Sequence, residues 1–151
     1  MKTNLLARIL MAATPVMIAG CLLASSATAM AQSADRHCSD QTLLGDYGFT
    51  IEGVILGPNL PVRGLDMAHF DGKGNITQVD HIVTNGLPPA QEWTPGTGTY
   101  TVNPDCTGVA VINSGSTPFP LNLHFVVVRQ GKEIRQVVDA NAVTAVGIRV
   151  Q

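Results

Sequence analysis

The chain has 151 residues, a formal net charge of −2 and few charged residues, 13% in all. This length corresponds to one domain, and the basic residues are too scattered to form a surface that follows nucleic-acid phosphates, so we expect no nucleic-acid partner. Beyond the first thirty residues no stretch approaches the eighteen consecutive apolar residues of a membrane helix, so we expect no membrane span.

The N-terminus carries the three parts of a secretory signal peptide. Two basic residues precede an apolar run over residues 9–24, and Ala29-Met30-Ala31 matches the small-residue cleavage pattern. We therefore expect a signal peptide over residues 1–31 and a secreted or periplasmic mature chain. An alternative stays open, because Ile18-Ala19-Gly20-Cys21 resembles the lipobox of bacterial lipoproteins and would place a lipid anchor on Cys21.

The mature chain keeps two cysteines and is acidic. The signal peptide holds two of the nine basic residues and none of the eleven acidic ones, so the remainder has a net charge of −4. Cys38 and Cys106 form an even pair in an oxidising compartment, and we expect a disulfide between them. It would close a loop of about 70 residues and stabilise the fold by roughly 4 kcal/mol on a chain-entropy argument.

The rest of the chain reads as a series of short strands. Tyr47, Phe49 and Ile51 alternate with small or polar residues in the first strand, the pattern of a half-buried strand. Seven further segments are rich in alternating or β-branched residues: 62–70, 76–84, 97–102, 109–112, 121–129, 133–139 and 143–150. Clusters of Gly, Pro, Asn and Asp separate them, as turns require.

These segments predict an all-β fold without helices. We expect a single antiparallel up-and-down barrel of about eight strands, calycin-like, over residues 43–151, with a barrel-like sandwich as the alternative. Residues 32–42 are expected to form an N-terminal tail held by Cys38. A closed barrel also removes the exposed strand edges that Val126-Val127-Val128 would otherwise present.

The hairpin over residues 62–84 presents two faces. If Phe70 pairs with Ile76, one face carries Leu65, Met67, His69, Val79, His81 and Val83, and the other carries Asp66, Ala68, Gln78 and Asp80. We expect the first face to point inward because it is the more apolar. Asp66 and Asp80 would then face each other on the solvated outside, and a register shift of one residue would exchange the two faces.

Several turn and strand motifs carry a resemblance that covers nearly all of the mature chain. They are Cys38, Leu44-Gly45-Asp46-Tyr47-Gly48-Phe49, Phe70-Asp71-Gly72-Lys73-Gly74-Asn75, Gly98-Thr99-Tyr100-Thr101-Val102-Asn103-Pro104-Asp105-Cys106-Thr107-Gly108, and Phe125-Val126-Val127-Val128 followed by Gly131-Lys132-Glu133. Together they resemble a group of small exported bacterial proteins of uncharacterised function. More loosely, the architecture resembles that of calycins and of allene oxide cyclase-like barrels. The resemblance implies a fold and no activity.

The sequence carries no established catalytic or metal-binding motif. G-x-S-x-G, H-E-x-x-H and a phosphate-binding loop are all absent, and we expect no cofactor and no metal ion. His69 and His81 share a face but would lie about 13 Å apart at the usual strand rise, too far for one ion. Asp71–Asn75 resembles part of a calcium loop but lacks its further acidic ligands, so we interpret it as a turn.

Other polar residues are expected to play structural roles. The serines of the mature chain are Ser33, Ser39, Ser114 and Ser116, which we place in the tail or in loops. Glu133 and Arg135 share a strand face and are expected to form a surface ion pair of little energetic value.

We expect an exported barrel that binds a small apolar ligand, since such sites are mostly apolar with a few placed polar atoms. The candidate ligand-binding residues are Tyr47, Phe49, Met67, His69, His81 and Phe125, with Val79 beside them. One alternative is a cofactor-independent isomerase or cyclase with Asp80, His81 or Glu52 as acid or base, so whether the protein is an enzyme stays open. Another is a structural or adhesive envelope protein that acts through its outer surface.

Overall fold

The computed structural model describes residues 37–151, so the expected signal peptide and Cys21 lie outside the described residues. It contains a 3₁₀ helix η1 (Asp40–Leu43), the strands β1 (Gly45–Ile55), β2 (Leu60–Phe70), β3 (Asn75–Thr84), β4 (Thr94–Val102), β5 (Thr107–Ser114) and β6 (Leu121–Val128), a second 3₁₀ helix η2 (Arg129–Gly131), and the strands β7 (Glu133–Val138) and β8 (Ala142–Arg149). No helix within residues 37–151 is long and apolar enough to span a membrane.

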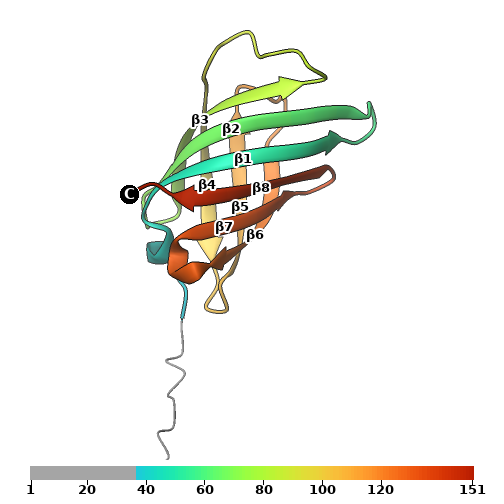
Figure 1. Cartoon of the computed structure of the whole chain (residues 1–151). Helices are drawn as coiled ribbons and strands as arrows, with labels where there is room; N and C mark the ends of the chain where they lie inside the picture. Colours follow the sequence, from blue (N-terminus) through green and yellow to red (C-terminus); the bar gives the residue numbers. More distant parts are fainter. Residues whose placement is uncertain (1–36) are drawn as a thin grey trace, which may run out of the picture. The chain divides into compact units, whose positions relative to one another are not determined.

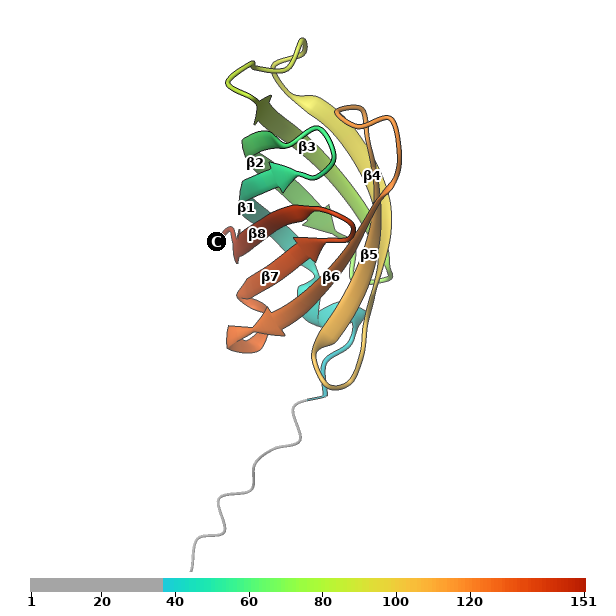
Figure 2. The same ribbon diagram turned by 90° about the vertical axis from the view of Figure 1, so that its right-hand side faces the viewer.

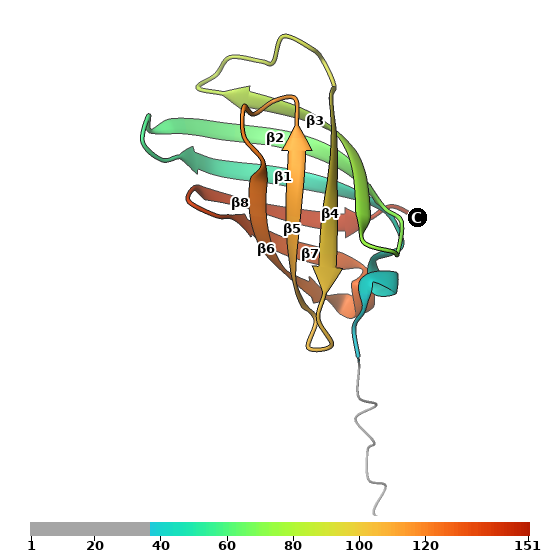
Figure 3. The same ribbon diagram turned by 180° about the vertical axis from the view of Figure 1, so that it is seen from behind.

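The eight strands form a closed antiparallel barrel, which confirms the predicted fold class. Each strand pairs with its neighbour in the chain, and β8 closes the sheet by pairing with β1. Figure 1 shows β1, β2, β7 and β8 in front of β4 and β5, and Figure 3 shows the opposite wall from behind. Each predicted strand lies within, or within about a residue of, an observed strand.

The up-and-down order gives the barrel two different ends. The turns β1–β2, β3–β4, β5–β6 and β7–β8 meet at one end, which we call the mouth, and Figure 2 views the barrel from the side of two of these turns. The turns β2–β3 and β4–β5, both 3₁₀ helices and the C-terminus lie at the other end, which we call the base (Figure 1). An even number of strands therefore places both ends of the described chain at the base.

Aromatic side chains fill the half of the barrel near the base. The Phe70 ring packs edge-on against Tyr47 and Tyr100, with centroids 5.3 and 5.0 Å apart. Glycines on neighbouring strands make room for further rings: a Cβ atom on Gly147 would lie 2.4 Å from the Phe49 ring. These contacts make the base half a packed core.

The base is closed by η1 and by a buried polar contact. Leu43 of η1 is fully buried in the core. Arg149 donates from Nη2 to the Thr42 carbonyl at 2.7 Å and to the Tyr47 hydroxyl at 2.7 Å. The Tyr47 hydroxyl in turn donates to the carbonyl oxygen of Gly131 in η2. One guanidinium thus joins η1, η2, β1 and β8.

The expected disulfide is confirmed and ties the segment before η1 to the base. Cys38 and Cys106 are bonded, with their Cα atoms 5.0 Å apart. Cys38 also donates its backbone N–H to the Pro104 carbonyl at 3.1 Å, and Asp40 accepts the Val102 N–H at 2.7 Å. The segment before β1 is therefore fixed to the β4–β5 turn by covalent and hydrogen bonds.

The predicted register of the 62–84 hairpin is confirmed, but the predicted orientation of its faces is wrong. Phe70 pairs with Ile76 and Asp66 with Asp80. Asp66 and Asp80 point inward, with 8% and 3% of their surface exposed, whereas Leu65 and Met67 are outside at 54% and 45%. On each strand the aspartate is an even number of positions from a large apolar residue, Phe70 on β2 and Ile76 on β3, so the two point to the same face. Because Phe70 and Ile76 are buried in the core, both carboxylates also point inward.

Candidate functional site

The half of the barrel near the mouth holds a cavity of about 560 Å³. Its wall is mostly aliphatic and includes Ile51, Val62, Ile82, Ile112, Leu123 and Val138. The β5–β6 turn forms part of the rim, where Phe119 lines the cavity and is also the most exposed large apolar side chain there, at 76%. A ligand that enters would meet Phe119 at the rim, beside polar residues such as Thr117 and Asn141.

Two carboxylates lie in this apolar wall. Asp66 on β2 and Asp80 on β3 are directly opposite each other in the register and both line the cavity. Opposed residues of an antiparallel pair have Cβ atoms about 5 Å apart, close enough for their charges to interact. The cavity therefore combines an apolar wall with a concentrated acidic group.

A small network of donors holds Asp80. Its Oδ2 atom accepts hydrogen bonds from Ser114 Oγ at 2.6 Å, Ser116 Oγ at 3.2 Å and Gln78 Nε2 at 3.2 Å. These three donors converge on one oxygen and hold the Asp80 side chain in a fixed orientation. Ser114 is the last residue of β5 and is buried, so its predicted place in a loop was wrong.

Asp66 has a different environment from that of Asp80. Burial, and to a smaller extent the nearby charge of Asp80, together raise the pKa of the Asp66 carboxyl to about 7. Its Oδ1 atom has no hydrogen-bond partner within residues 37–151, and neither has Oδ1 of Asp80. At neutral pH the Asp66 carboxyl therefore lies close to the point at which it gains or loses its proton.

The six residues predicted to bind a ligand do not line this cavity. Tyr47, Phe49 and Phe125 point into the barrel, but they belong to the packed core on the base side. Met67 lies on the outer face because of the reversed hairpin faces, and the same reversal exposes Val79.

The two predicted histidines also lie outside, each with its own partner. His69 Nδ1 lies 2.7 Å from Asp46 Oδ1, and its side chain is half exposed. His81 Nδ1 lies 2.6 Å from the carbonyl oxygen of Glu92, and its ring packs against Trp93 with centroids 5.9 Å apart. Within the described part of the chain, no three His, Cys, Asp or Glu side chains are grouped as metal ligands would be.

Of the three residues proposed as acid or base in the alternative, catalytic hypothesis, two also lie outside the barrel. Glu52 is exposed on the outer surface and forms an ion pair with Arg63 at 2.8 Å. His81 is on the outer face as well, and Asp80 alone of the three lines the cavity. Asp66 was not predicted as a site residue. It lies four positions before Phe70 on the same strand, so the inward position of a large aromatic side chain would have indicated that Asp66 also points inward.

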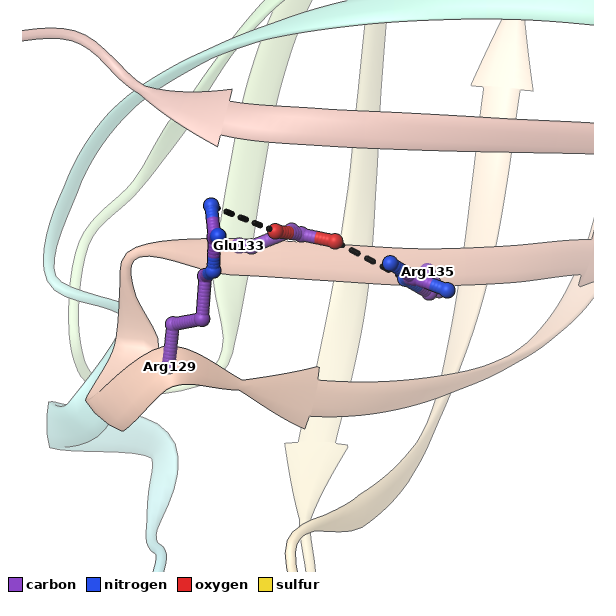
Figure 4. A network of polar contacts seen from close by, with 3 residues as sticks. All are labelled: Arg129, Glu133 and Arg135. Carbon is purple, nitrogen blue, oxygen red and sulfur yellow. Dashed lines mark hydrogen bonds and ion pairs between the residues drawn. The ribbon is translucent and has the colours of Figure 1, made fainter.

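A third buried carboxylate lies away from the cavity. Glu133, at the start of β7, has a side chain only 6% exposed, although it was expected in a surface pair. Figure 4 shows it between Arg129 and Arg135, which reach its two oxygens at 3.3 and 2.8 Å. Both guanidiniums are mostly exposed, so this arrangement neutralises a buried charge and leaves no open position for a ligand.

Two features of the outer surface, the turn at Asp71 and an open hollow near Glu52, do not form a binding site. The Asp71 carboxylate accepts the N–H groups of Lys73 and Asn75 at 2.7 and 2.9 Å, which confirms the predicted turn. A hollow of about 640 Å³ lies on the outside near Glu52 and Arg63. Because it is open and flanked by an exposed ion pair, it would remove little ligand surface from water.

Comparison with known proteins does not extend these assignments. No protein-family model matches the chain, and a search of curated proteins finds no match either. The cavity and the two carboxylates that line it remain the features of the described chain that point to a function.

Proposed function

We propose that the protein binds a small, largely apolar molecule inside the barrel. The observation that carries this proposal is the cavity of about 560 Å³ at the mouth, whose mostly apolar wall contains the opposed carboxylates of Asp66 and Asp80 together with a few neutral polar side chains, among them Gln136. Cavities that hold small molecules are typically about 300–1,000 Å³ and combine apolar walls with a few placed polar atoms. The packed base leaves the mouth as the route of entry.

The binding of a neutral apolar dye, Nile red, tests this proposal. We expect saturable binding of one dye per protein, with fluorescence shifted as in an apolar environment. Ala145 of β8 lines the cavity, so Ala145→Phe would fill part of it and should lower dye affinity at least tenfold. Val146→Phe is the matched control, since Val146 is the next residue of the same strand and points outward. Equal binding by both variants would contradict an internal site.

Export supports the same function. The leader pattern indicates secretion, and the Cys38–Cys106 disulfide fits an oxidising compartment.

Native mass spectrometry of protein purified from the exported fraction distinguishes the two processing routes. A mature mass beginning at Gln32 indicates ordinary cleavage, a diacylglycerol adduct on Cys21 indicates a lipid anchor, and a co-purified small molecule would identify the ligand. A mass that retains the leader would contradict export.

A second candidate function is proton transfer on an apolar substrate, as in a cofactor-independent isomerase. The observation that favours it is the Asp66 carboxyl, whose pKa of about 7 suits a general acid or base at neutral pH. Asp80, held by its three donors, would act as the opposite partner. Hydrogen–deuterium exchange at a carbon of a bound carbonyl compound tests this role: Asp66→Asn should abolish exchange and keep binding, and unchanged exchange would contradict it.

A further inference from the structure

We propose that the ligand of this cavity carries an ammonium group, which Asp66 and Asp80 hold together. This inference rests on the proposed binding function and names the class of molecule bound: an amine with an apolar body. It starts from the two Oδ1 atoms. Both belong to side chains more than nine-tenths buried, both residues line the cavity, and neither atom has a hydrogen-bond partner within residues 37–151.

Unpartnered buried carboxylate oxygens are costly, and no residue within 37–151 donates a hydrogen bond to the two Oδ1 atoms. A buried acceptor without a donor costs roughly 1–3 kcal/mol, and more when it is charged. The donors that reach the pair, from Ser114, Ser116 and Gln78, all converge on Oδ2 of Asp80. A molecule in the cavity that brings donors of its own could reach the two Oδ1 atoms.

The charge of the cavity selects the kind of donor. None of the described residues that line it is Lys, Arg or His. On β1 the residue opposite Asp66 is Phe49, and on β3 it is Asp80. The remaining carboxylate of the lining, Asp139 at the mouth, is paired with His124 outside at 2.9 Å. Nothing in the wall opposes the negative charge of the pair, so a cationic ligand group would find no competing cation.

An ammonium group fits this environment better than the other common head groups do. It brings a positive charge and up to three N–H donors, enough for both Oδ1 atoms. An alcohol has one O–H donor and no charge, and a carboxylate would be repelled. A calcium ion needs six to eight oxygen ligands and usually several carboxylates, whereas no third His, Cys, Asp or Glu side chain within residues 37–151 joins Asp66 and Asp80 as a metal ligand would.

Three probes of one chain length test the proposal: n-octylamine, 1-octanol and octanoate, measured by calorimetry at pH 8. We expect the amine to bind at least tenfold more tightly than the alcohol and octanoate to bind most weakly. In the double variant Asp66→Asn/Asp80→Asn the amine and the alcohol should bind equally, with the alcohol affinity kept within a few fold. Asp46→Asn is the control, since Asp46 is an exposed aspartate outside the barrel, bonded to His69.

The outcomes separate this inference from the binding function on which it rests. Equal binding of amine and alcohol by the natural protein, or an amine preference that survives in the double variant, would overturn the ammonium proposal and leave the apolar site intact. If neither Nile red nor any of the three probes binds, both proposals fail. Displacement of the amine by calcium chloride at matched ionic strength would point to a metal ion and also overturn it. Denaturation curves of each variant establish that it is folded.

Discussion

The Arg149 guanidinium lies 5.2 Å above the centre of the Tyr47 ring and donates hydrogen bonds to the hydroxyl of the same tyrosine. This contact joins the last strand to the first at the base of the barrel. The same guanidinium also bonds the carbonyls of Thr42 and Gly131, so it holds both 3₁₀ helices in place. We regard it as the closure of the barrel at the end opposite the cavity.

Replacing Arg149 should therefore weaken the fold and spare the cavity. Arg149→Met keeps an apolar stem but leaves the Thr42 and Gly131 carbonyls without this donor, and we expect a loss of about 2 kcal/mol in the free energy of unfolding. Arg149→Lys should restore only part of the lost stability, because one ammonium group cannot reach the Thr42 carbonyl, the Gly131 carbonyl and the Tyr47 hydroxyl together. Urea denaturation measures both, with the exposed Arg63→Met as control. A double-mutant cycle with Tyr47→Phe that shows no coupling would contradict this account.

The Asp66 carboxyl predicts a specific dependence of stability on pH. An ordinary aspartate releases its proton near pH 3.8, whereas folded Asp66 releases it at about pH 7. Between these values the folded state binds one more proton than the unfolded state, so this residue lowers stability as pH rises and its effect is complete above pH 7. Between pH 3 and pH 8 this titration lowers the free energy of unfolding by about 4 kcal/mol.

Asp66→Asn removes this contribution. Relative to the natural protein the variant should gain stability progressively from pH 4 to pH 8, measured by urea denaturation at intervals across that range. Glu52→Gln, at an exposed position, should give a nearly constant difference. Parallel stability curves for the natural protein and the Asp66 variant would show that Asp66 titrates as an ordinary carboxyl.

In the cluster of Glu133, Arg129 and Arg135, removing the arginines should destabilise the fold more than removing the carboxylate. Replacing both arginines, by Arg129→Met and Arg135→Met together, leaves a buried carboxylate without its cations and should cost about 3 kcal/mol. Glu133→Gln leaves two exposed guanidiniums in water and should cost only about 1 kcal/mol. Thermal or urea denaturation compares them. An equal or larger loss for Glu133→Gln would mean that the carboxylate is better solvated than its burial indicates.

The disulfide predicts a large effect of reduction on stability. Cys38 and Cys106 are 68 positions apart, and opening a loop of that size should cost roughly 4 kcal/mol. The double variant Cys38→Ser/Cys106→Ser and the natural protein in dithiothreitol should then unfold at the same lowered urea concentration. An unchanged midpoint would show that the hydrogen bonds of Cys38 and Asp40 hold the segment without the bridge.

The sequence was sufficient to predict the strands, their turns and the disulfide. In Leu121–Val128 the side chains alternate as the sequence pattern implies, with Leu123 and Phe125 buried and His124 and Val126 exposed. Proline and glycine clusters placed the turns because these residues are excluded from, or weaken, strand interiors. Local chemistry of this kind determines where a strand begins and ends, and closure of the sheet then follows from the strand order.

The site was harder to predict because it departs from the usual division between polar and apolar faces. Leu65, Met67 and Val79 made the outer face of the hairpin look like the core, whereas Asp66 and Asp80 occupy inward positions. Such carboxylates are unfavourable for stability and are retained at inward positions mainly where they interact with something else. Ser114 was missed for a related reason, since its role depends on Asp80, 34 residues away.

The Cys38–Cys106 bond also determines how the molecule would respond to mechanical force. A pull on the chain ahead of Cys38 would pass through the two sulfur atoms to Cys106 and bypass β1. The four strands β1 to β4 lie within the covalent loop and could not be extended while the bond is intact. Only the part from Cys106 to the C-terminus would lengthen, and it could do so only after the pairing of β8 with β1 and of β5 with β4 had broken.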